Sequence, residues 1–155
     1  MNIVVNTIGK PSEGWQKEVL DMYLQRIKAM TNLSENCFAT PKRTKQNSIN
    51  KLKHSEYKLL SQHIPKGAYV IALDENGPLY SSHAYARKLQ QYNENHQTIC
   101  YLIGGPDGLS EQIFEHTHEK LALGKFTLPH ILARVILYEQ LYRCLTLIHK
   151  HPYHR

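Results

Sequence analysis

The apolar residues of the chain fall into two alternating patterns, short continuous runs and longer stretches in which they recur every three or four residues. Short runs bounded by turn residues are typical of buried strands, whereas the longer spacing is typical of helices. The runs predict strands at residues 2–9, 36–40, 67–74 and 97–105, and a brief strand from residue 121. The periodic stretches predict helices at residues 12–30, 49–60, 81–95, 109–120 and 130–148.

Alternating strands and helices, with strands that are almost continuously apolar, are typical of an α/β fold with a mostly parallel sheet and helices on both faces. The chain has no internal repeat and no linker rich in Gly, Pro or Ser, so we expect one domain over residues 1–155. Ligands of such sheets bind at the carboxyl ends of the strands. Unusual loops follow three strands there, "ALDENG", "IGGPDG" and "LGKFTLP", and this fold class allows them to converge.

The sequence "YLIGGPDGLS" (Tyr101–Ser110) has a glycine-rich loop after a predicted strand. Such a loop is typical of a position where the backbone comes close to another group. It lacks the Lys-Ser/Thr pair of a phosphate loop and the G-x-G-x-x-G spacing of a dinucleotide fold. Gly104 and Gly105 have no Cβ, so the chain there can turn sharply and expose amide and carbonyl groups. An ordinary strand-to-helix turn is the alternative. In the third loop, apolar Phe126 and Leu128 favour a flat organic ligand, such as a purine, held by backbone amides.

The charge of the chain suits a polyanionic partner, although an ordinary basic protein is the alternative. Lys and Arg number 19 against 13 Asp and Glu, a net charge of +6. The cations gather in Pro41–Lys58 and in the tail "HKHPYHR", which favours an extended anionic ligand over a small one.

The cysteines and the hydropathy of the chain indicate the cellular compartment. The three cysteines are odd in number and widely spaced, which favours a reducing compartment, and so the cytoplasm, over a disulfide framework or a zinc site. No apolar run approaches the length of about eighteen residues that a membrane span needs, so we expect no membrane association. The first residues, "MNIVVNTIGK", have no signal-peptide pattern.

The last predicted helix is apolar on more than one face, which predicts burial on both sides. One side can pack on its own sheet and the other on a second subunit, because the chain is small for a fully buried helix; a central helix of a monomer is the alternative. Arg143 follows Glu139 by four residues, so a simple intrahelical pair competes with a role in phosphate binding. His149, His151 and His154 lie close together without Cys or carboxylate nearby, so we expect no metal site.

The motifs "YLIGGPDGLS", "FTLPH", "ARVILYEQLYRC" and "HPYHR", in this order, closely resemble those of the SPOUT-class methyltransferases. Within that class the chain is similar to the RlmH-type enzymes, which methylate N3 of a pseudouridine in 23S ribosomal RNA. The resemblance covers the full length and is strongest from Tyr101 to Arg155. It implies an α/β domain with a C-terminal trefoil knot, a homodimer, and S-adenosylmethionine as methyl donor.

The resemblance also implies roles for individual residues. Cofactor-binding positions of the family fall on Leu73, Gly105, Gly124, Lys125, Phe126, Thr127, Leu128 and Pro129. The residues at the positions of Gly124 and Lys125 vary within the family. Binding of the cofactor through backbone atoms would tolerate this variation. Family arginines match Arg134 and Arg143, of which we expect Arg134 to bind RNA.

For the chemistry, His154 is the candidate base for the N3 proton, because histidine titrates near neutrality. Tyr153 would stack on the base, and Arg143 with Arg155 would hold RNA backbone or a developing negative charge. Orientation alone, without a general base, is the alternative. Two other functions stay open, a SPOUT enzyme with another RNA target and a non-catalytic RNA-binding module. Because the chain has no additional RNA-binding domain, we expect a large structured substrate, which assembled ribosomes fit; free ribosomal RNA is the alternative.

Overall fold

A computed structural model describes residues 1–95 and 98–154. Its five strands form one parallel sheet in the order β2-β1-β4-β3-β5. The strands are β1 (Asn2–Ile8), β2 (Asn32–Phe38), β3 (Tyr69–Leu73), β4 (Thr98–Ile103) and β5 (Glu119–Leu121). The central strands β1, β3 and β4 are buried on both faces, as the continuous apolar runs predict. The predicted α/β fold is therefore confirmed.

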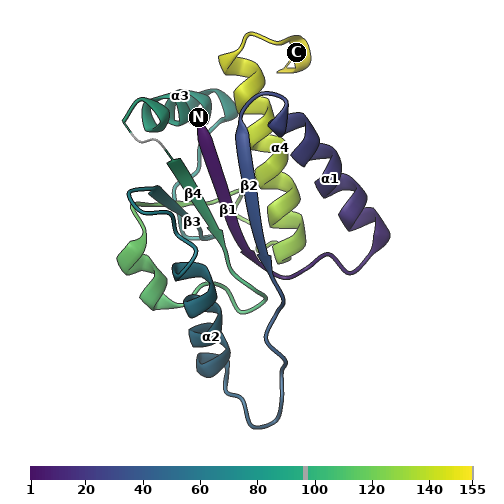
Figure 1. The fold of residues 1–155 in the computed structure, drawn as a ribbon, viewed down its shortest axis with the longest axis vertical. Coiled ribbons are helices and arrows are strands. Elements are labelled where there is room, and N and C mark those ends of the chain that lie inside the picture. The colour runs from purple at the N-terminus through teal and green to yellow at the C-terminus, as the bar shows by residue number, and fades with distance from the viewer. Residues whose placement is uncertain (96–97, 155) are drawn as a thin grey trace.

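Helices cover both faces of this sheet (Figure 1). On one face α1 (Gly14–Lys28), α3 (Ser82–Asn95) and α4 (His130–Ile148) bury the larger core. On the other face α2 (Ile49–Ser61) and the 3-10 helix η1 (Glu111–His116) bury the smaller one, around Ile8, Val70 and Leu102. A last 3-10 turn, η2 (Pro152–His154), follows α4.

The end helix α4 lies between α1 and α3 on its face of the sheet. Its side chains Leu137, Tyr138 and Leu141 are fully buried, and Leu132 is the one large apolar side chain of the helix that is well exposed. Other apolar side chains of the helix, among them Ile136 and Leu147, are only half-buried within this chain. Packing of this side on a second subunit is not tested by a single chain, so dimerisation stays a prediction.

Element boundaries differ from the predicted ones where polar residues lie in the sheet. β2 begins at Asn32, four residues before the predicted strand, because it is an edge strand whose polar side chains have partners. Asn36, for example, donates from its amide to Oδ1 of Asn6 at 2.8 Å. β5 takes in Glu119, a residue predicted to be helical, whose carboxylate accepts hydrogen bonds from the hydroxyls of Tyr69, Tyr80 and Tyr92.

Two further boundaries shift slightly. α1 begins at Gly14 with Glu13 as its N-cap, rather than at Ser12, and the Gln16 side chain accepts a hydrogen bond from the N–H of Ser12 at 2.9 Å. The short predicted helix before β5 is η1, with Ser110 as the expected N-cap. Gln97, where the fourth strand is predicted to begin, lies outside the described residues.

Candidate active site

The three loops singled out in the sequence leave three neighbouring strands at one edge of the sheet. Leu73, the last residue of β3, lies opposite Leu121 of β5, and its neighbour Ala72 lies opposite Leu102 of β4. Because the strands are parallel and in this register, the loops after Leu73, Ile103 and Leu121 begin side by side. The predicted convergence at the carboxyl edge is confirmed.

The first loop, residues 74–77, is fixed against the third. The N–H of Asp74 donates to the carbonyl of Leu121 at 3.0 Å, and the Asp74 carboxylate pairs with Nζ of Lys120 at 2.8 Å. Burial raises the pKa of Asp74, but Lys120 and the N–H of Asn76 outweigh this effect and lower the pKa overall. A Cβ on Gly77 would lie 2.9 Å from the backbone N of Leu121, so only glycine permits this contact.

The glycine loop after β4 packs against a carboxylate that we did not single out in the sequence. A Cβ on Gly105 would lie 2.5 Å from Oε1 of Glu56, and the N–H of Gly105 donates to Oε2 of Glu56 at 3.3 Å. The side chain of Glu56, on α2, is only 4% exposed. The close packing of Gly105 against the Glu56 side chain therefore gives a reason within the chain for a glycine at this position. Burial raises the pKa of Glu56, although the hydrogen bond from Gly105 opposes the shift.

A signal for Glu56 was present in the sequence. It is four residues after Leu52 and four before Leu60, and the structure buries all three on one face of α2. A carboxylate in the middle of an apolar stripe therefore indicates a buried partner.

The third loop, residues 124–129, offers backbone donors. Within residues 1–95 and 98–154, no hydrogen bond is made by the N–H groups of Gly124 to Leu128. The Thr127 hydroxyl donates to Glu75 of the first loop at 2.7 Å. Phe126 is 85% exposed, which is unusual for an aromatic ring. This loop therefore has both the free amides and the apolar side chain that the sequence predicts for a flat organic ligand.

The candidate catalytic residues lie at the opposite end of α4. Arg143 makes two hydrogen bonds to Oε1 of Glu139, at 2.9 and 2.7 Å, so the intrahelical pair exists. Its guanidinium also stacks over the ring of Tyr153, 5.1 Å from the centroid. The Tyr153 ring in turn contacts Tyr142 edge-on, with centroids 4.6 Å apart. Arg143 and Tyr153 therefore form one cluster.

The length of α4 separates this cluster from the three loops. From Pro129 to Arg143 the helix advances fourteen residues, or about 21 Å at 1.5 Å per residue. Figure 1 shows the chain end at the opposite end of the sheet from the start of α4. His154 ends η2, but its side chain and all of Arg155 lie outside the described residues. The structure thus brings the candidate cofactor residues together, and separately Arg143 and Tyr153, but does not join the two groups in one chain.

Arg134 is an internal residue in this structure. Its side chain is 3% exposed and pairs with Glu35 of β2, at 2.5 Å from NH2 and 2.8 Å from Nε. The same carboxylate accepts a hydrogen bond from the Tyr138 hydroxyl. The guanidinium of Arg134 thus faces away from solvent and joins the first turns of α4 to the edge strand.

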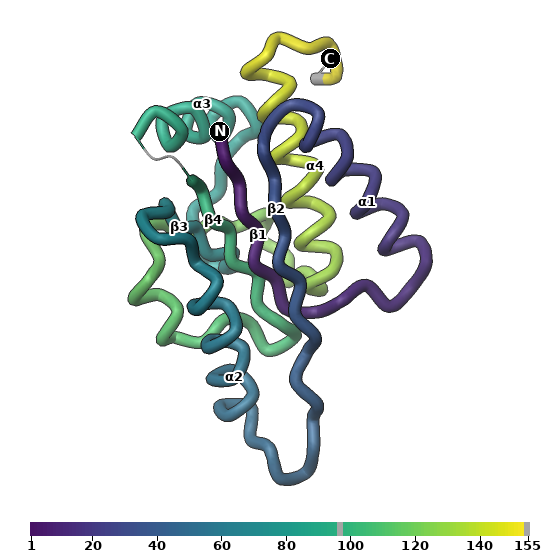
Figure 2. Tube along the Cα trace, viewed as in Figure 1, coloured from purple at the N-terminus to yellow at the C-terminus, as the bar shows by residue number. Residues whose placement is uncertain are grey.

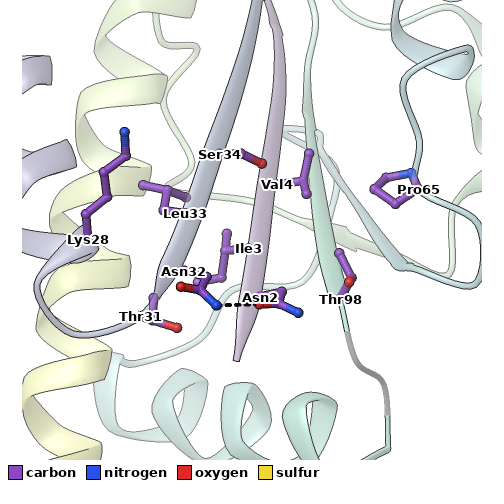
Figure 3. Close-up of a pocket in the computed structure, with 10 residues that line it drawn as sticks. All are labelled: Asn2, Ile3, Val4, Lys28, Thr31, Asn32, Leu33, Ser34, Pro65 and Thr98. Carbon is purple, nitrogen blue, oxygen red and sulfur yellow. Dashed lines mark hydrogen bonds between the residues drawn. The ribbon is translucent and has the colours of Figure 1, made fainter.

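A separate hollow lies at the amino ends of the strands (Figure 3). It measures about 520 Å³ and is open to solvent, lined by Asn2, Asn32, Lys28 and Thr98 among others. It lies at the end of the sheet opposite to the three loops, so we do not assign the candidate site to it. Among the described residues no cluster of His, Cys, Asp or Glu is arranged to hold a metal ion, and none of the helices could cross a membrane.

The arrangement defines a class of protein, a parallel α/β fold with a candidate ligand site at the carboxyl edge. Solved structures with this fold include a "probable methyltransferase" from Bordetella pertussis, with a TM-score of 0.56 and 14% identity over 93% of this chain and 96% of that one. A methylase-family protein from Neisseria gonorrhoeae aligns with a TM-score of 0.51 and 14% identity, over 91% of this chain and 81% of that one.

The sequence is more specific than the fold. Residues 1–154 match the family described as "Predicted SPOUT methyltransferase", and the chain belongs to that family. Proteins named "Ribosomal RNA large subunit methyltransferase H" are 38% identical in Nitrosococcus oceani, 37% in Hydrogenovibrio crunogenus and 34% in Legionella pneumophila. Each covers all of this chain with 99% of its own length.

The buried ion pair gives a stability prediction. We expect Arg134→Ala to lower the free energy of unfolding by about 3–5 kcal/mol, because it leaves a largely buried carboxylate without its counter-charge. Urea unfolding measures the loss, and the double variant with Glu35→Gln should lose less than the single one. Arg43→Ala, which breaks a pair whose arginine is 55% exposed, is the control and should cost less than about 1 kcal/mol. Equal losses for the two arginine variants would contradict the assignment.

The buried Glu56 gives a pH prediction. Because its pKa is raised in the folded state, folding is favoured at low pH and loses that contribution as the pH rises through the folded pKa. The variant Glu56→Gln stays neutral, so its stability relative to the wild type should increase as the pH rises above the usual glutamate pKa of about 4.3. Unfolding by urea at several pH values measures the difference. A difference that is constant with pH would show that Glu56 is not buried as a carboxyl group.

Proposed function

We propose that this protein is an S-adenosylmethionine-dependent methyltransferase that methylates N3 of a pseudouridine in 23S ribosomal RNA. Membership of the SPOUT methyltransferase family and the full-length similarity to the large subunit methyltransferases support this proposal. The observation in the structure that carries it is the convergence of three loops at the carboxyl edge, one with unpaired backbone amides.

The residues at this edge fit the cofactor. The free N–H groups of Gly124 to Leu128 can hold the adenosine edge and the methionine carboxylate, and Phe126 can cover an apolar face. Leu73 is half-buried between the loops, where it can contact the purine. Gly105 contributes less through its own backbone than the sequence predicts, because its N–H is bonded to Glu56 and its carbonyl accepts from Gly108 at 3.0 Å.

We infer that the active site is composed of two chains. Arg143 and Tyr153 lie about 21 Å along α4 from the loops of their own chain, a distance that a helix cannot shorten. A homodimer with twofold symmetry places the tail of each subunit at one surface and its loops at another, so each tail can reach the loops of its partner. Exposed Leu132, Trp15 and Met22 are apolar surface that such a contact can bury.

The chemistry follows from this arrangement. Bound S-adenosylmethionine supplies an electrophilic methyl group on a sulfonium. His154 would accept the proton of N3, since the neutral imide is a weak nucleophile, and so leave N3 able to displace the thioether sulfur from the methyl carbon. Tyr153 stacks on the base and aligns N3 with the methyl carbon, which carries much of the rate in an in-line displacement. Arg143 and Arg155 hold the RNA backbone or the carbonyl oxygen on which negative charge develops.

The cellular setting fits this substrate. Three cysteines are free in the structure, as expected in the reducing cytoplasm where ribosomes are found.

The activity is tested by methyl transfer from radiolabelled S-adenosylmethionine to assembled ribosomes, to protein-free large-subunit RNA and to bulk transfer RNA. We expect label on the ribosomal fraction, and none when the target pseudouridine is replaced by uridine. Label on transfer RNA alone would assign another target within the family. Failure to bind S-adenosylmethionine would leave a non-catalytic RNA-binding module.

The two-chain site is tested by complementation. Thr127→Pro removes one of the free amides of the loop and should abolish cofactor binding, whereas His154→Ala should lower turnover but keep cofactor affinity. The two inactive variants are co-expressed with different affinity tags, so that the heterodimer can be purified. In this heterodimer one site has both an intact loop and an intact tail. About half of the activity of a wild-type dimer should return, since one of two equivalent sites is complete. No recovery of activity in a purified heterodimer would contradict the two-chain site. Equal loss of turnover and of cofactor affinity in His154→Ala would reject His154 as the base.

A further inference from the structure

The basic segment 41–58, which neither the cofactor loops nor the tail includes, forms an exposed cationic surface. It comprises the loop after β2 and most of α2, and Figure 2 shows this part of the chain extending beyond the carboxyl ends of the strands. Its cations are exposed except for half-buried Lys53: Lys42, Arg43, Lys45, Lys51 and Lys58.

Most of the charge of this surface has no ion-pair partner in residues 1–95 and 98–154. Glu56, the single acidic residue of the segment, is buried under the glycine loop. Arg43 is the one cation of the segment with an ion pair among the described residues, to Asp107. The acidic residues of adjacent η1, Glu111 and Glu115, make no ion pair with it in that part of the chain. The remaining lysines therefore present unpaired charge to solvent.

The segment is fixed beside the candidate active site at two points. Arg43 pairs with Asp107 at 2.5 Å, and Glu56 accepts the hydrogen bond from Gly105. Both partners belong to the loop "IGGPDG" after β4. On α2, Lys51 and Lys58 are two turns apart, about 10 Å, and point to the same side of the helix. Cations thus extend from the edge of the site outward over α2.

We propose that the basic segment 41–58 is a docking surface for the phosphate backbone of the substrate RNA, which leads the target nucleotide to the adjacent site. The identity of the RNA as ribosomal rests on the proposed function. The composition of the surface favours nucleic acid over an acidic protein. Lysine is depleted in protein interfaces, which need a buried apolar centre, whereas it binds phosphate as a point charge. Ile49 is the one large apolar side chain exposed in the segment.

The test removes three lysines that have no side-chain partner among the described residues, in the triple variant Lys45→Ala, Lys51→Ala and Lys58→Ala. Alanine favours helix at the two positions in α2, so the fold is retained. The matched control removes three exposed cations from other elements, Lys28→Ala, Lys66→Ala and Arg87→Ala, with the same change in net charge.

The measurement is the affinity for protein-free large-subunit ribosomal RNA at several salt concentrations, with binding of S-adenosylmethionine measured in parallel. We expect the triple variant to bind this RNA at least about tenfold more weakly than the wild type near 0.15 M salt. The slope of log affinity against log salt concentration should fall by the equivalent of about 2 to 3 phosphate contacts. The control should stay close to the wild type, and cofactor affinity should be the same in all three proteins.

Each other outcome overturns the proposal. Equal weakening in the triple and control variants would mean that net charge, not this surface, determines the affinity. Weaker binding to assembled ribosomes but not to protein-free RNA would assign the surface to a ribosomal protein. These results are independent of catalysis. A wild type that binds RNA through this segment but methylates none of the substrates above would reject the proposed function and keep the docking surface.

Discussion

The helix α4 spans the sheet from its carboxyl edge to its amino edge, and the arrangement of the candidate site depends on this. Its first turn follows the loop 124–129, and its last turns carry Arg143 and lead to Tyr153. The pair between Arg134 and Glu35 fixes the start of the helix to β2, while Tyr142 contacts Tyr23 of α1 near its end, with ring centroids 6.5 Å apart. A rigid helix anchored at both ends cannot bring its two ends together. The candidate cofactor loops and the candidate catalytic residues therefore lie at two separate surfaces of the chain.

The carboxyl edge is itself organised by a contact between the two faces of the fold. Glu56 belongs to the helix on one face, yet it reaches the turn that ends the central strand β4. Burying a carboxylate costs free energy unless it is hydrogen-bonded, and among the described residues the N–H of Gly105 is the one hydrogen-bond donor to it. This contact joins the glycine loop to α2 and so places a basic helix beside the candidate site. The glycine thus serves the packing of the loop as well as access to it.

Much of this fold follows from local pattern, because strands and helices differ in the spacing of their apolar residues. The bounds of α4 and the order of the elements agree with the prediction for this reason. The start of β2 and the strand character of Glu119 were missed, since their polar side chains are satisfied by partners such as Arg134 and Tyr80, far away in the sequence. Local spacing contains no information on such partners. Arg134 shows the same limit, because a family motif identifies the position but not the side to which its side chain points.

The division of the candidate site between the two edges of the sheet has a physical consequence for how the chain can act on RNA. Phosphate contacts fix the position of a nucleic acid but carry little information on its sequence, whereas contacts to an extruded base select the target. The basic segment and the cofactor loops share the carboxyl edge, while the residues able to stack on a base are on the tail at the other edge. With the roles proposed above, one chain alone would hold RNA next to the methyl donor without the groups that orient the base. In the proposed dimer a second copy would supply the missing tail, so the helix length that divides the candidate site within a chain would make activity conditional on assembly.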